Sequence, residues 1–194
     1  MRLKVVQAGE PLLRRAAEPL AIKEIPSLET ARLIEDMRET LQDAPGVGLA
    51  APQVGLGIQL AIIEDRPEYT RDLPPEQLAE RERIPVPFHV IINPKLVPIG
   101  KKQVDFYEGC LSVAGAVAIV PRYREVRVTC LDENGQRRTI EARGWYARIL
   151  QHEIDHLNGT LYLDRMLSRT FSTLENYSRH WKSKSIADSL RELK

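Results

Sequence analysis

Apolar residues recur at helical spacing in three stretches of the chain, and residues that favour helix ends stand beside two of them. Ser27 is a suitable N-cap for the first stretch, and Pro45 and Gly46 end it. Gly159 suits the position just after the second stretch. The spacing predicts helices at about 27–43, 144–157 and 185–193. Their apolar stripes are Leu28, Ala31, Ile34, Met37 and Leu41; Ala147, Leu150, Ile154 and Leu157; and Ile186, Leu190 and Leu193.

Shorter apolar or alternating runs predict β-strands between these helices. Residues 59–64 form one such run, and residues 90–93 form a buried one that Pro94 is expected to end. Residues 124–132 and 136–142 alternate on either side of Asp132-Glu133-Asn134-Gly135, which is typical of a hairpin turn. Further short strands are expected near 96–99, 103–107, 116–120 and 161–163, and a glycine-rich turn at 48–57. The pattern predicts an α+β fold in which antiparallel strands surround a central 144–157 helix, with the 27–43 helix outside.

The length of 194 residues suits one domain with a substantial core, so we expect a single domain spanning residues 1–194. Residues 65–87 are charged and rich in proline, and no second core follows them. We expect this segment to be a surface insertion that contains a short exposed helix near 75–83. An amphipathic helical tail is expected near 185–193.

Composition narrows the classes of function. The chain has 28 Lys+Arg against 27 Asp+Glu, and this balance gives no indication of DNA binding. No apolar run approaches the length of a membrane span, and the N-terminus has neither a signal-peptide core nor a convincing transit peptide. With only two cysteines, a reducing compartment is favoured over a secreted disulfide scaffold. Cys130 lies in an alternating segment and is expected to be a small buried hydrophobic residue.

Residues 151–159 contain the strongest indication of chemistry. His152 and His156 are four residues apart, so a helix would present both imidazoles on one face, where they can bind a single metal ion. Glu153 stands beside the first histidine and is placed to move protons without being a ligand. The alternative is a helix with two surface histidines and a solvated glutamate.

A catalytic metal site usually needs a third protein ligand. A thermolysin-like site would take a downstream Glu, and a metzincin site a third His, but His180 lacks the metzincin spacing after His156. The better candidate is Cys110, in Glu108-Gly109-Cys110-Leu111-Ser112, because one thiolate and two imidazoles suit zinc or ferrous iron. A further segment, Gly46-Val47-Gly48-Leu49-Ala50-Ala51-Pro52-Gln53, has glycines that let backbone approach a ligand closely, although alone it indicates only a tight turn.

Together these three segments resemble the peptide deformylase family, whose members remove the formyl group from the N-terminal methionine of new polypeptides. The glycine-rich turn ending in Ala-Pro-Gln, the Glu-Gly-Cys-Leu-Ser segment and the Gln-His-Glu helix occur here in the family's order, and the resemblance extends over about residues 3–176. It implies one divalent metal ion, with Fe²⁺ expected natively and Zn²⁺, Ni²⁺ or Co²⁺ as substitutes. It also implies N-formyl-methionyl nascent peptides as substrates.

Carried over by motif, the resemblance implies Cys110, His152 and His156 as metal ligands and Glu153 as the general base and then acid. The metal would lower the pKa of its water, which attacks the formyl carbon. The Gln53 side-chain amide and the Leu111 N–H would stabilise the oxyanion, with about 3 kcal/mol for each donor.

The substrate-binding residues that the resemblance implies are Gly48, Gly109, Val47 and Ile149. Gly48 is expected to bond the substrate backbone, and Val47 and Ile149 are candidates for an apolar slot for methionine. Glu108 and Arg122 are candidates for a charge pair that braces the Cys110 segment, and Asp155 for an acceptor of a ligand histidine. The alternative for these three is an ordinary structural or surface charge.

Residues 144–150 and 169–171 look like the subgroup of the family found in organelles and some bacteria. A bacterial cytoplasmic enzyme is favoured, with a mature mitochondrial or plastid form as the alternative. The mildly basic tail allows a transient ribosome contact, against the alternative of a solvated helix packed on the domain. Two rival functions stay open: a zinc endopeptidase that uses the same helix, and a degenerate homologue that only binds peptides or ribosomes.

Overall fold

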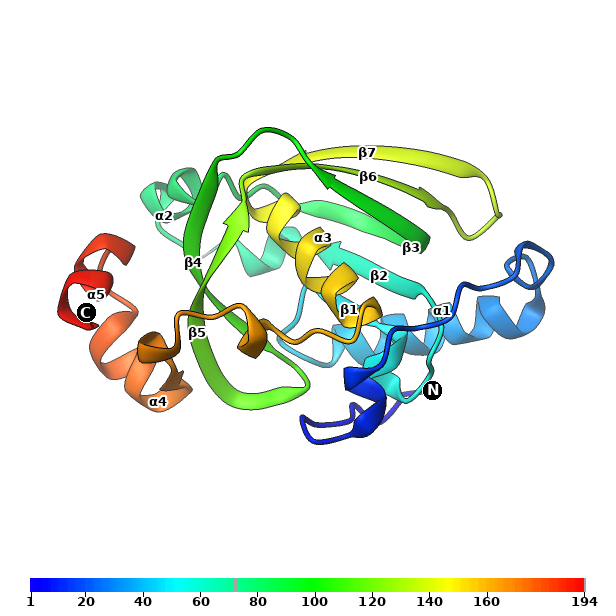
Figure 1. Cartoon of the computed structure of the whole chain (residues 1–194), viewed down its shortest axis with the longest axis horizontal. Helices are drawn as coiled ribbons and strands as arrows, with labels where there is room; N and C mark the ends of the chain where they lie inside the picture. Colours follow the sequence, from blue (N-terminus) through cyan, green and yellow to red (C-terminus); the bar gives the residue numbers. More distant parts are fainter. Residues whose placement is uncertain (72, 194) are drawn as a thin grey trace.

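The computed structural model describes residues 1–71 and 73–193, and within these ranges the strands form two antiparallel sheets (Figure 1). One sheet has five strands in the order β1-β2-β3-β6-β7, and the other has three in the order β4-β5-β8. The strands are β1 (Gly48–Ala50), β2 (Leu60–Asp65), β3 (Val86–Pro98), β4 (Gln103–Cys110), β5 (Val113–Tyr123), β6 (Glu125–Leu131), β7 (Arg137–Arg143) and β8 (Ser172–Thr173). The α-helices are α1 (Leu28–Gln42), α2 (Pro75–Glu80), α3 (Gly144–Leu157), α4 (Leu174–Asn176) and α5 (Ile186–Leu193).

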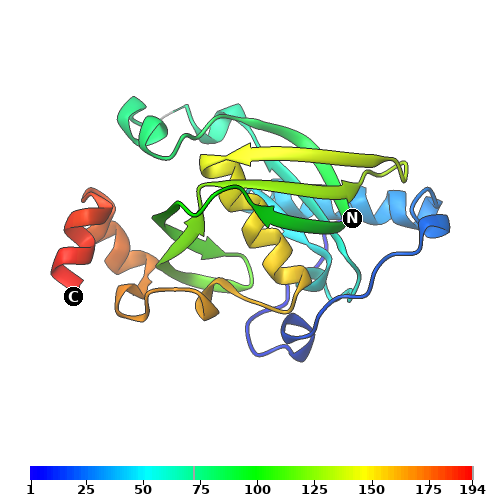
Figure 2. The same ribbon diagram turned by 45° about the horizontal axis from the view of Figure 1, so that its top comes forward.

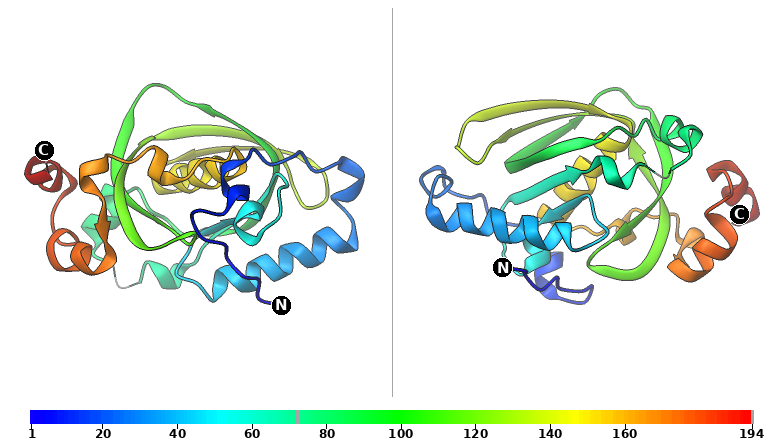
Figure 3. Two further views of the ribbon diagram at one scale, coloured as in Figure 1. Left: turned by 60° about the horizontal axis from the view of Figure 1, so that its bottom comes forward. Right: turned by 180° about the vertical axis from the view of Figure 1, so that it is seen from behind.

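Within the five-stranded sheet, strand β2 is buried on both faces, whereas β6 and β7 alternate between buried and more exposed residues. Successive side chains of a strand point to opposite faces. Leu60 and Ile62 accordingly pack in a cluster with residues of α1, whereas Ala61 and Ile63 pack in a second cluster with residues of α3. All six β2 residues are buried. The sheet therefore separates an outer helix, α1, from an inner one, α3 (Figure 3).

Helix α3 lies between the two sheets and contacts strands of both (Figure 2). The residues of its predicted apolar stripe are all buried, and Ala147 and Leu150 have 0% exposure. Gly159 follows the helix with φ +71°, a left-handed conformation that glycine adopts without steric strain. The predicted α+β fold, with antiparallel strands around the central helix, is confirmed.

The strand that was expected to stop at Pro94 continues through it as β3. The register with β6 shifts between Ile92 and Lys95, and Asn93 has φ +51°. This bulge places Pro94 where its missing N–H is tolerated. The Asn93 amide exchanges two hydrogen bonds of 2.8 Å with the backbone of Leu20, which holds the bulge in place.

Two further local predictions were wrong in part. Residues 162–164 form a 3₁₀ turn instead of a strand, because the Asp164 carboxylate accepts a 2.8 Å hydrogen bond from Leu161 N–H. The 48–57 segment contains a strand and a 3₁₀ helix (Ala51–Val54) rather than a simple turn.

Helix α1 buries Ile34, Met37 and Leu41 of its predicted stripe but departs from that stripe in its first turn. Ser27 caps the helix as expected, through a 3.1 Å hydrogen bond from Thr30 N–H. However, Leu28 is 78% exposed and Ala31 is exposed, whereas Thr30 is buried. The Thr30 hydroxyl donates a 2.8 Å hydrogen bond to the Glu24 carbonyl, so the first turn packs on the preceding segment.

Two peripheral segments complete the fold. The 65–87 segment is closed at its base by a bidentate pair, in which Arg83 donates hydrogen bonds of 2.9 and 2.8 Å to Asp65. The C-terminal helices pack on the β4–β5 hairpin, where Ile186 and Leu190 of α5 join a cluster with Tyr107. In the described part of the chain, no helix has the length and apolarity needed to cross a membrane.

Candidate metal centre

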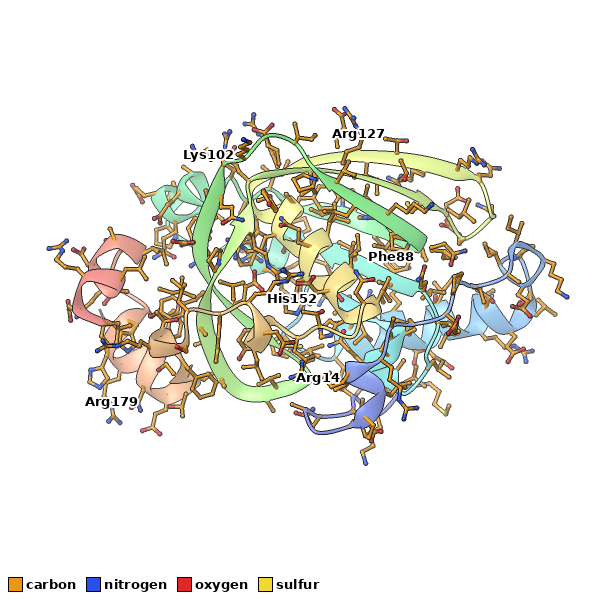
Figure 4. The ribbon with its side chains drawn as sticks, viewed as in Figure 1. Arg14, Phe88, Lys102, Arg127, His152 and Arg179 are labelled. Atoms are coloured by element: carbon orange, nitrogen blue, oxygen red, sulfur yellow. The ribbon has the colours of Figure 1, made fainter. Side chains whose placement is uncertain are left out.

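Helix α3 and the end of β4 bring three potential metal ligands together. His152 and His156 are one helical turn apart, with ring centroids separated by 5.0 Å. Cys110 ends β4, and its Sγ lies 3.2 Å from Nε2 of His156. One ligand atom from each residue lies within 4.8 Å of the others, so all three can reach a single ion. Figure 4 shows His152 near the middle of the molecule, whereas Arg127 and Arg179 lie at its edges.

The backbone around Cys110 exposes its thiol to hydrogen-bond donors. The β4–β5 register changes abruptly, from Gly109 opposite Val117 to Cys110 opposite Val113, so β4 ends in a tight turn. Ser112 N–H and the Gln53 amide point at Sγ from 3.4 and 3.5 Å. The sulfur that would bind a metal therefore has two N–H donors beside it.

Glu108 orients the first histidine. Its Oε2 lies 3.0 Å from Nδ1 of His152, which leaves Nε2 of that ring for a metal. Arg122 makes two hydrogen bonds of 2.9 Å to Glu108, and Arg148 adds one of 2.6 Å. The predicted Glu108–Arg122 pair is therefore present, and all three of these charged side chains are buried.

Asp155 does not contact a histidine, so its predicted role was wrong. Its carboxylate instead binds Arg122 and Arg165, and Arg165 donates hydrogen bonds of 2.6 and 2.7 Å. Glu108 is the acceptor instead, because β4 places its Oε2 3.0 Å from Nδ1 of His152. The spacing of residues along helix α3 could not reveal a hydrogen-bond partner that comes from strand β4.

Burial and ionic partners together shift the pKa values of Glu108 and His156. Burial alone would raise the pKa of Glu108, but the hydrogen bond to His152 and the charge of Arg122 lower it far below the usual value. Burial lowers the pKa of His156 well below its usual value, which favours the neutral imidazole that a metal ligand requires. Its Nδ1 is buried without a hydrogen-bond partner among the described residues.

Glu153 is the buried carboxylate of α3 that the ion-pair network leaves unpaired. It is 3% exposed, and its Oε2 has no hydrogen-bond partner within the described ranges. Burial raises its pKa to about 7. A β-carbon built on Gly48 would lie 2.3 Å from its Oε1, so the glycine of β1 leaves the space that this carboxylate occupies. The group is thus available for proton transfer.

Gln53 is held with its amide nitrogen toward the ligands. Its Oε1 accepts a 2.8 Å hydrogen bond from Ala50 N–H, and Nε2 then faces Ser112 Oγ at 3.3 Å and the Cys110 thiol. Leu111 follows Cys110 in the turn that ends β4 and lines the same cleft. Both positions are compatible with donors to an oxyanion near the metal, and these roles stay predictions.

The predicted site residues converge on one cleft of about 570 Å³. Nine of them line it, and the tenth, His156, lies buried beside Cys110. The nine are Val47, Gly48, Gln53, Gly109, Cys110, Leu111, Ile149, His152 and Glu153.

Sequence reasoning missed several residues of this cleft, among them Arg83, Trp145, Arg148 and Leu174. Arg148 stands four residues before His152, so the same helical spacing that revealed the histidines could have indicated it. Arg83 and Leu174 come from segments without any motif, and nothing in the sequence places them at the cleft.

The contact between Gly48 and Glu153 gives a direct prediction. Gly48→Ala is expected to push the Glu153 carboxylate aside and to lower kcat about tenfold to a hundredfold, since misplacement of a catalytic group by about 1 Å has effects of this size. Steady-state kinetics measure the change. Gly57→Ala is the matched control for glycine replacement, because Gly57 is not left-handed and a β-carbon there meets only the end of the Leu12 side chain, at 3.3 Å. An unchanged kcat in Gly48→Ala would contradict this close packing.

The donor set fits a metal that accepts soft and intermediate ligands. A thiolate and two imidazoles are typical of zinc or ferrous iron sites, and three protein ligands leave room for water or substrate. The second nitrogen of His152 is fixed by a carboxylate, as in many metal sites. Cys110, His152 and His156 would hold the ion.

Comparisons with known proteins agree with this arrangement. The family model described as polypeptide deformylase matches residues 2–171. The chain is 48% identical over 172 residues to "Peptide deformylase 1A, chloroplastic" of Solanum lycopersicum, covering 89% of this chain but only 62% of that relative. It is 49% identical over 179 residues to "Peptide deformylase 3" of Streptomyces avermitilis, covering 92% of this chain and 78% of the relative.

A solved structure shows the same similarity in three dimensions. The Met-Ala-Ser-bound class I type b peptide deformylase of Acinetobacter baumannii superimposes with a TM-score of 0.76 at 32% identity, over 86% of this chain and 99% of that one. The family match covers most of the chain and contains all ten candidate site residues. The chain therefore belongs to the polypeptide deformylase family.

Proposed function

We propose that the chain is a metal-dependent hydrolase that removes the formyl group from the N-terminal formyl-methionine of new polypeptides and releases formate. The observation that carries this proposal is the convergence of Cys110, His152 and His156 beside a buried, unpaired Glu153 in one cleft. Family membership supports the same activity.

When bound, a divalent metal supplies Lewis-acid chemistry, because it lowers the pKa of water and polarises a carbonyl oxygen. Glu153 accepts the proton from the attacking water and delivers it to the leaving amine nitrogen as the C–N bond breaks. The Gln53 amide and the Leu111 N–H donate hydrogen bonds to the oxygen that gains negative charge. Formate and a free N-terminal methionine are the products.

The substrate side of the cleft suits a methionine that follows the formyl group. Val47 and Ile149 offer apolar walls next to Glu153 and His152, and Trp145 extends this surface. Gly48 and Gly109 bring backbone close to the ligands, where a peptide backbone could bond. A formyl group carries only hydrogen on its carbonyl carbon, so a tight fit at the metal end excludes longer acyl groups.

Fe²⁺ is the metal we propose for the native site, with Zn²⁺, Ni²⁺ or Co²⁺ as substitutes on the same ligands. The mixed thiolate and imidazole set supports this choice. We also propose the bacterial cytoplasm as the compartment, with a mitochondrial or plastid compartment as the alternative. Both cysteines are free thiols, which suits a reducing environment, and the relatives include bacterial and chloroplast proteins.

For the C-terminal tail we propose a solvated helix packed on the domain rather than a transient ribosome contact. The apolar side of α5 already packs on the β4–β5 hairpin, so only its charged outer side is available for a partner. Several charges there are paired within the tail, including Lys184 with Glu192 and Arg191 with Asp188. This packing favours the solvated helix over ribosomal docking.

The cysteine ligand separates this function from a zinc endopeptidase. Among the described residues, the group of His, Cys, Asp and Glu side chains able to hold one metal consists of Cys110, His152 and His156. A thermolysin-like acidic ligand from a downstream segment is not part of it. The intact set of candidate catalytic residues also gives no support to a degenerate homologue.

The deciding experiment measures formate release from formyl-Met-Ala-Ser by protein purified without oxygen and loaded with Fe²⁺. We expect rapid release, no acetate from the acetylated peptide and no cleavage of internal peptide bonds. Cys110→Ala is expected to lose both the bound metal and the activity, because two imidazoles alone hold a metal poorly. Cys130→Ala, which removes the other thiol away from the cleft, should keep both. A metal-loaded parent that released no formate would overturn the proposed function.

A further inference from the structure

The cleft extends well beyond the metal ligands, and its far wall comes from the C-terminal segment. Leu174, the first residue of α4, lines the same cleft as Cys110, His152 and Glu153. The family match ends at residue 171, so this wall lies outside the matched part of the chain. A volume of about 570 Å³ is several times that of one side chain, and the cleft therefore has room for more than methionine.

Leu174 is held in a fixed place. Strand β8 pairs with β5, with Ser172 opposite Val117 and Thr173 opposite Ala116. The Thr173 hydroxyl then accepts a 3.2 Å hydrogen bond from Asn176 N–H and caps α4. Just beyond, the Tyr177 ring packs on Tyr107, with centroids 4.7 Å apart. Leu174 nevertheless keeps 49% of its surface exposed, on a segment fixed at both ends.

The strand registers give the distance of this wall from the metal ligands. Gly109, next to Cys110, lies opposite Val117, and Val117 lies opposite Ser172. Two strand spacings of about 4.8 Å separate Gly109 from Ser172 by roughly 10 Å. An extended peptide advances about 3.3 Å per residue, so this length corresponds to about three residues. The wall at Leu174 is therefore within reach of the second or third residue of a bound substrate.

The residues that line the cleft beside Leu174 are apolar. Beside Leu174 the lining includes Ala116 and Val117, whose β5 backbone pairs with Thr173 and Ser172 just before Leu174. The two arginines that line the cleft are already paired within the protein, Arg148 with Glu108 at 2.6 Å and Arg83 with Asp65 at 2.8 Å. An apolar substrate side chain would bury surface here, whereas a charged one would lose water without gaining a partner.

We propose that Leu174 is a specificity-determining residue, which contacts the second or third residue of the substrate and favours an apolar side chain there. This inference rests on the proposed function and refines its substrate class. Phe171 provides an internal comparison. It has the same 49% exposure in the same segment but does not line the cleft, so exposure alone does not produce the contact.

The experiment compares kcat/KM for formyl-Met-Leu-Ala, formyl-Met-Ala-Leu and formyl-Met-Ala-Ala in the Fe²⁺-loaded protein. We expect the parent to favour one of the leucine peptides over the alanine peptide by about threefold to tenfold, less than a methylene contributes in a closed pocket, because Leu174 is half exposed. The difference should appear mainly in KM. Leu174→Ala is expected to bring that ratio close to one, Leu174→Met to retain it, and Phe171→Ala to leave it at the parent value.

The ratio is insensitive to partial unfolding, because loss of folded enzyme lowers kcat/KM for all three peptides equally. A parent without preference, or a preference that survives in Leu174→Ala, would overturn the role of Leu174 while leaving deformylation intact. A parent that releases no formate from any of the peptides would overturn the proposed function itself. The two failures are therefore distinguishable.

Discussion

Glu153→Gln is expected to lower kcat for formate release about 10²-fold to 10⁴-fold, the range that a general acid–base group supplies. Glutamine has nearly the same size and fits the space beside Gly48, but it cannot accept the proton of the attacking water. The other carboxylate near the ligands cannot substitute for it, because Glu108 is bound by Arg122, Arg148 and His152. Metal content should not change, since Glu153 lies outside the ligand group.

Steady-state kinetics and metal analysis on the same preparation test both halves of this prediction. Glu141→Gln is the matched control, because Glu141 is 61% exposed in a surface pair with Arg127 on the neighbouring strand. It should keep the parent kcat. If the Glu153 variant lost its metal together with its activity, Glu153 would be a ligand rather than a proton carrier.

The ligand set could be anticipated from the sequence because its strongest part is local. His152, Glu153 and His156 lie within two turns of one helix, and helical geometry alone determines that the imidazoles share a face. The assignment of Cys110 as a ligand depended in addition on the order of three motifs that lie far apart in the sequence. The hairpin at 132–135 was also predictable, since its turn residues stand between two alternating strands that the structure confirms as β6 and β7.

The errors arose where a contact with a distant segment decides the local structure. Pro94 should end a strand, but the Asn93 amide bonds to Leu20 and stabilises a bulge that accommodates the proline. Leu28 fits the helical stripe of α1, yet the first turn packs on the preceding segment through the hydrogen bond from Thr30 to Glu24, and Leu28 stays 78% exposed. Asp155 was predicted as the acceptor for a ligand histidine, but the fold brings Glu108 of β4 to 3.0 Å from Nδ1 of His152 instead.

The largest stability effect is expected from Arg122→Met, which should lower the free energy of unfolding by about 3–5 kcal/mol. Arg122 is 3% exposed and bridges two buried carboxylates, those of Glu108 and Asp155. Methionine fills much of the space but leaves both acidic groups with one cation fewer. Breaking a buried network by removing one partner is costly because the remaining charges stay desolvated.

Denaturant unfolding of the metal-free protein measures this loss without the contribution of bound metal to stability. Arg127→Met is the control, because Arg127 is 50% exposed and its pair with Glu141 is solvated, so the change should stay below about 1 kcal/mol. The same Arg122 variant is expected to bind metal about tenfold to a hundredfold more weakly, since Glu108 would no longer be held against His152. A loss of stability no larger than that of the control would show that Arg148 and Arg165 alone neutralise the two carboxylates. In that case Arg122 would not be needed to orient the histidine that binds the metal.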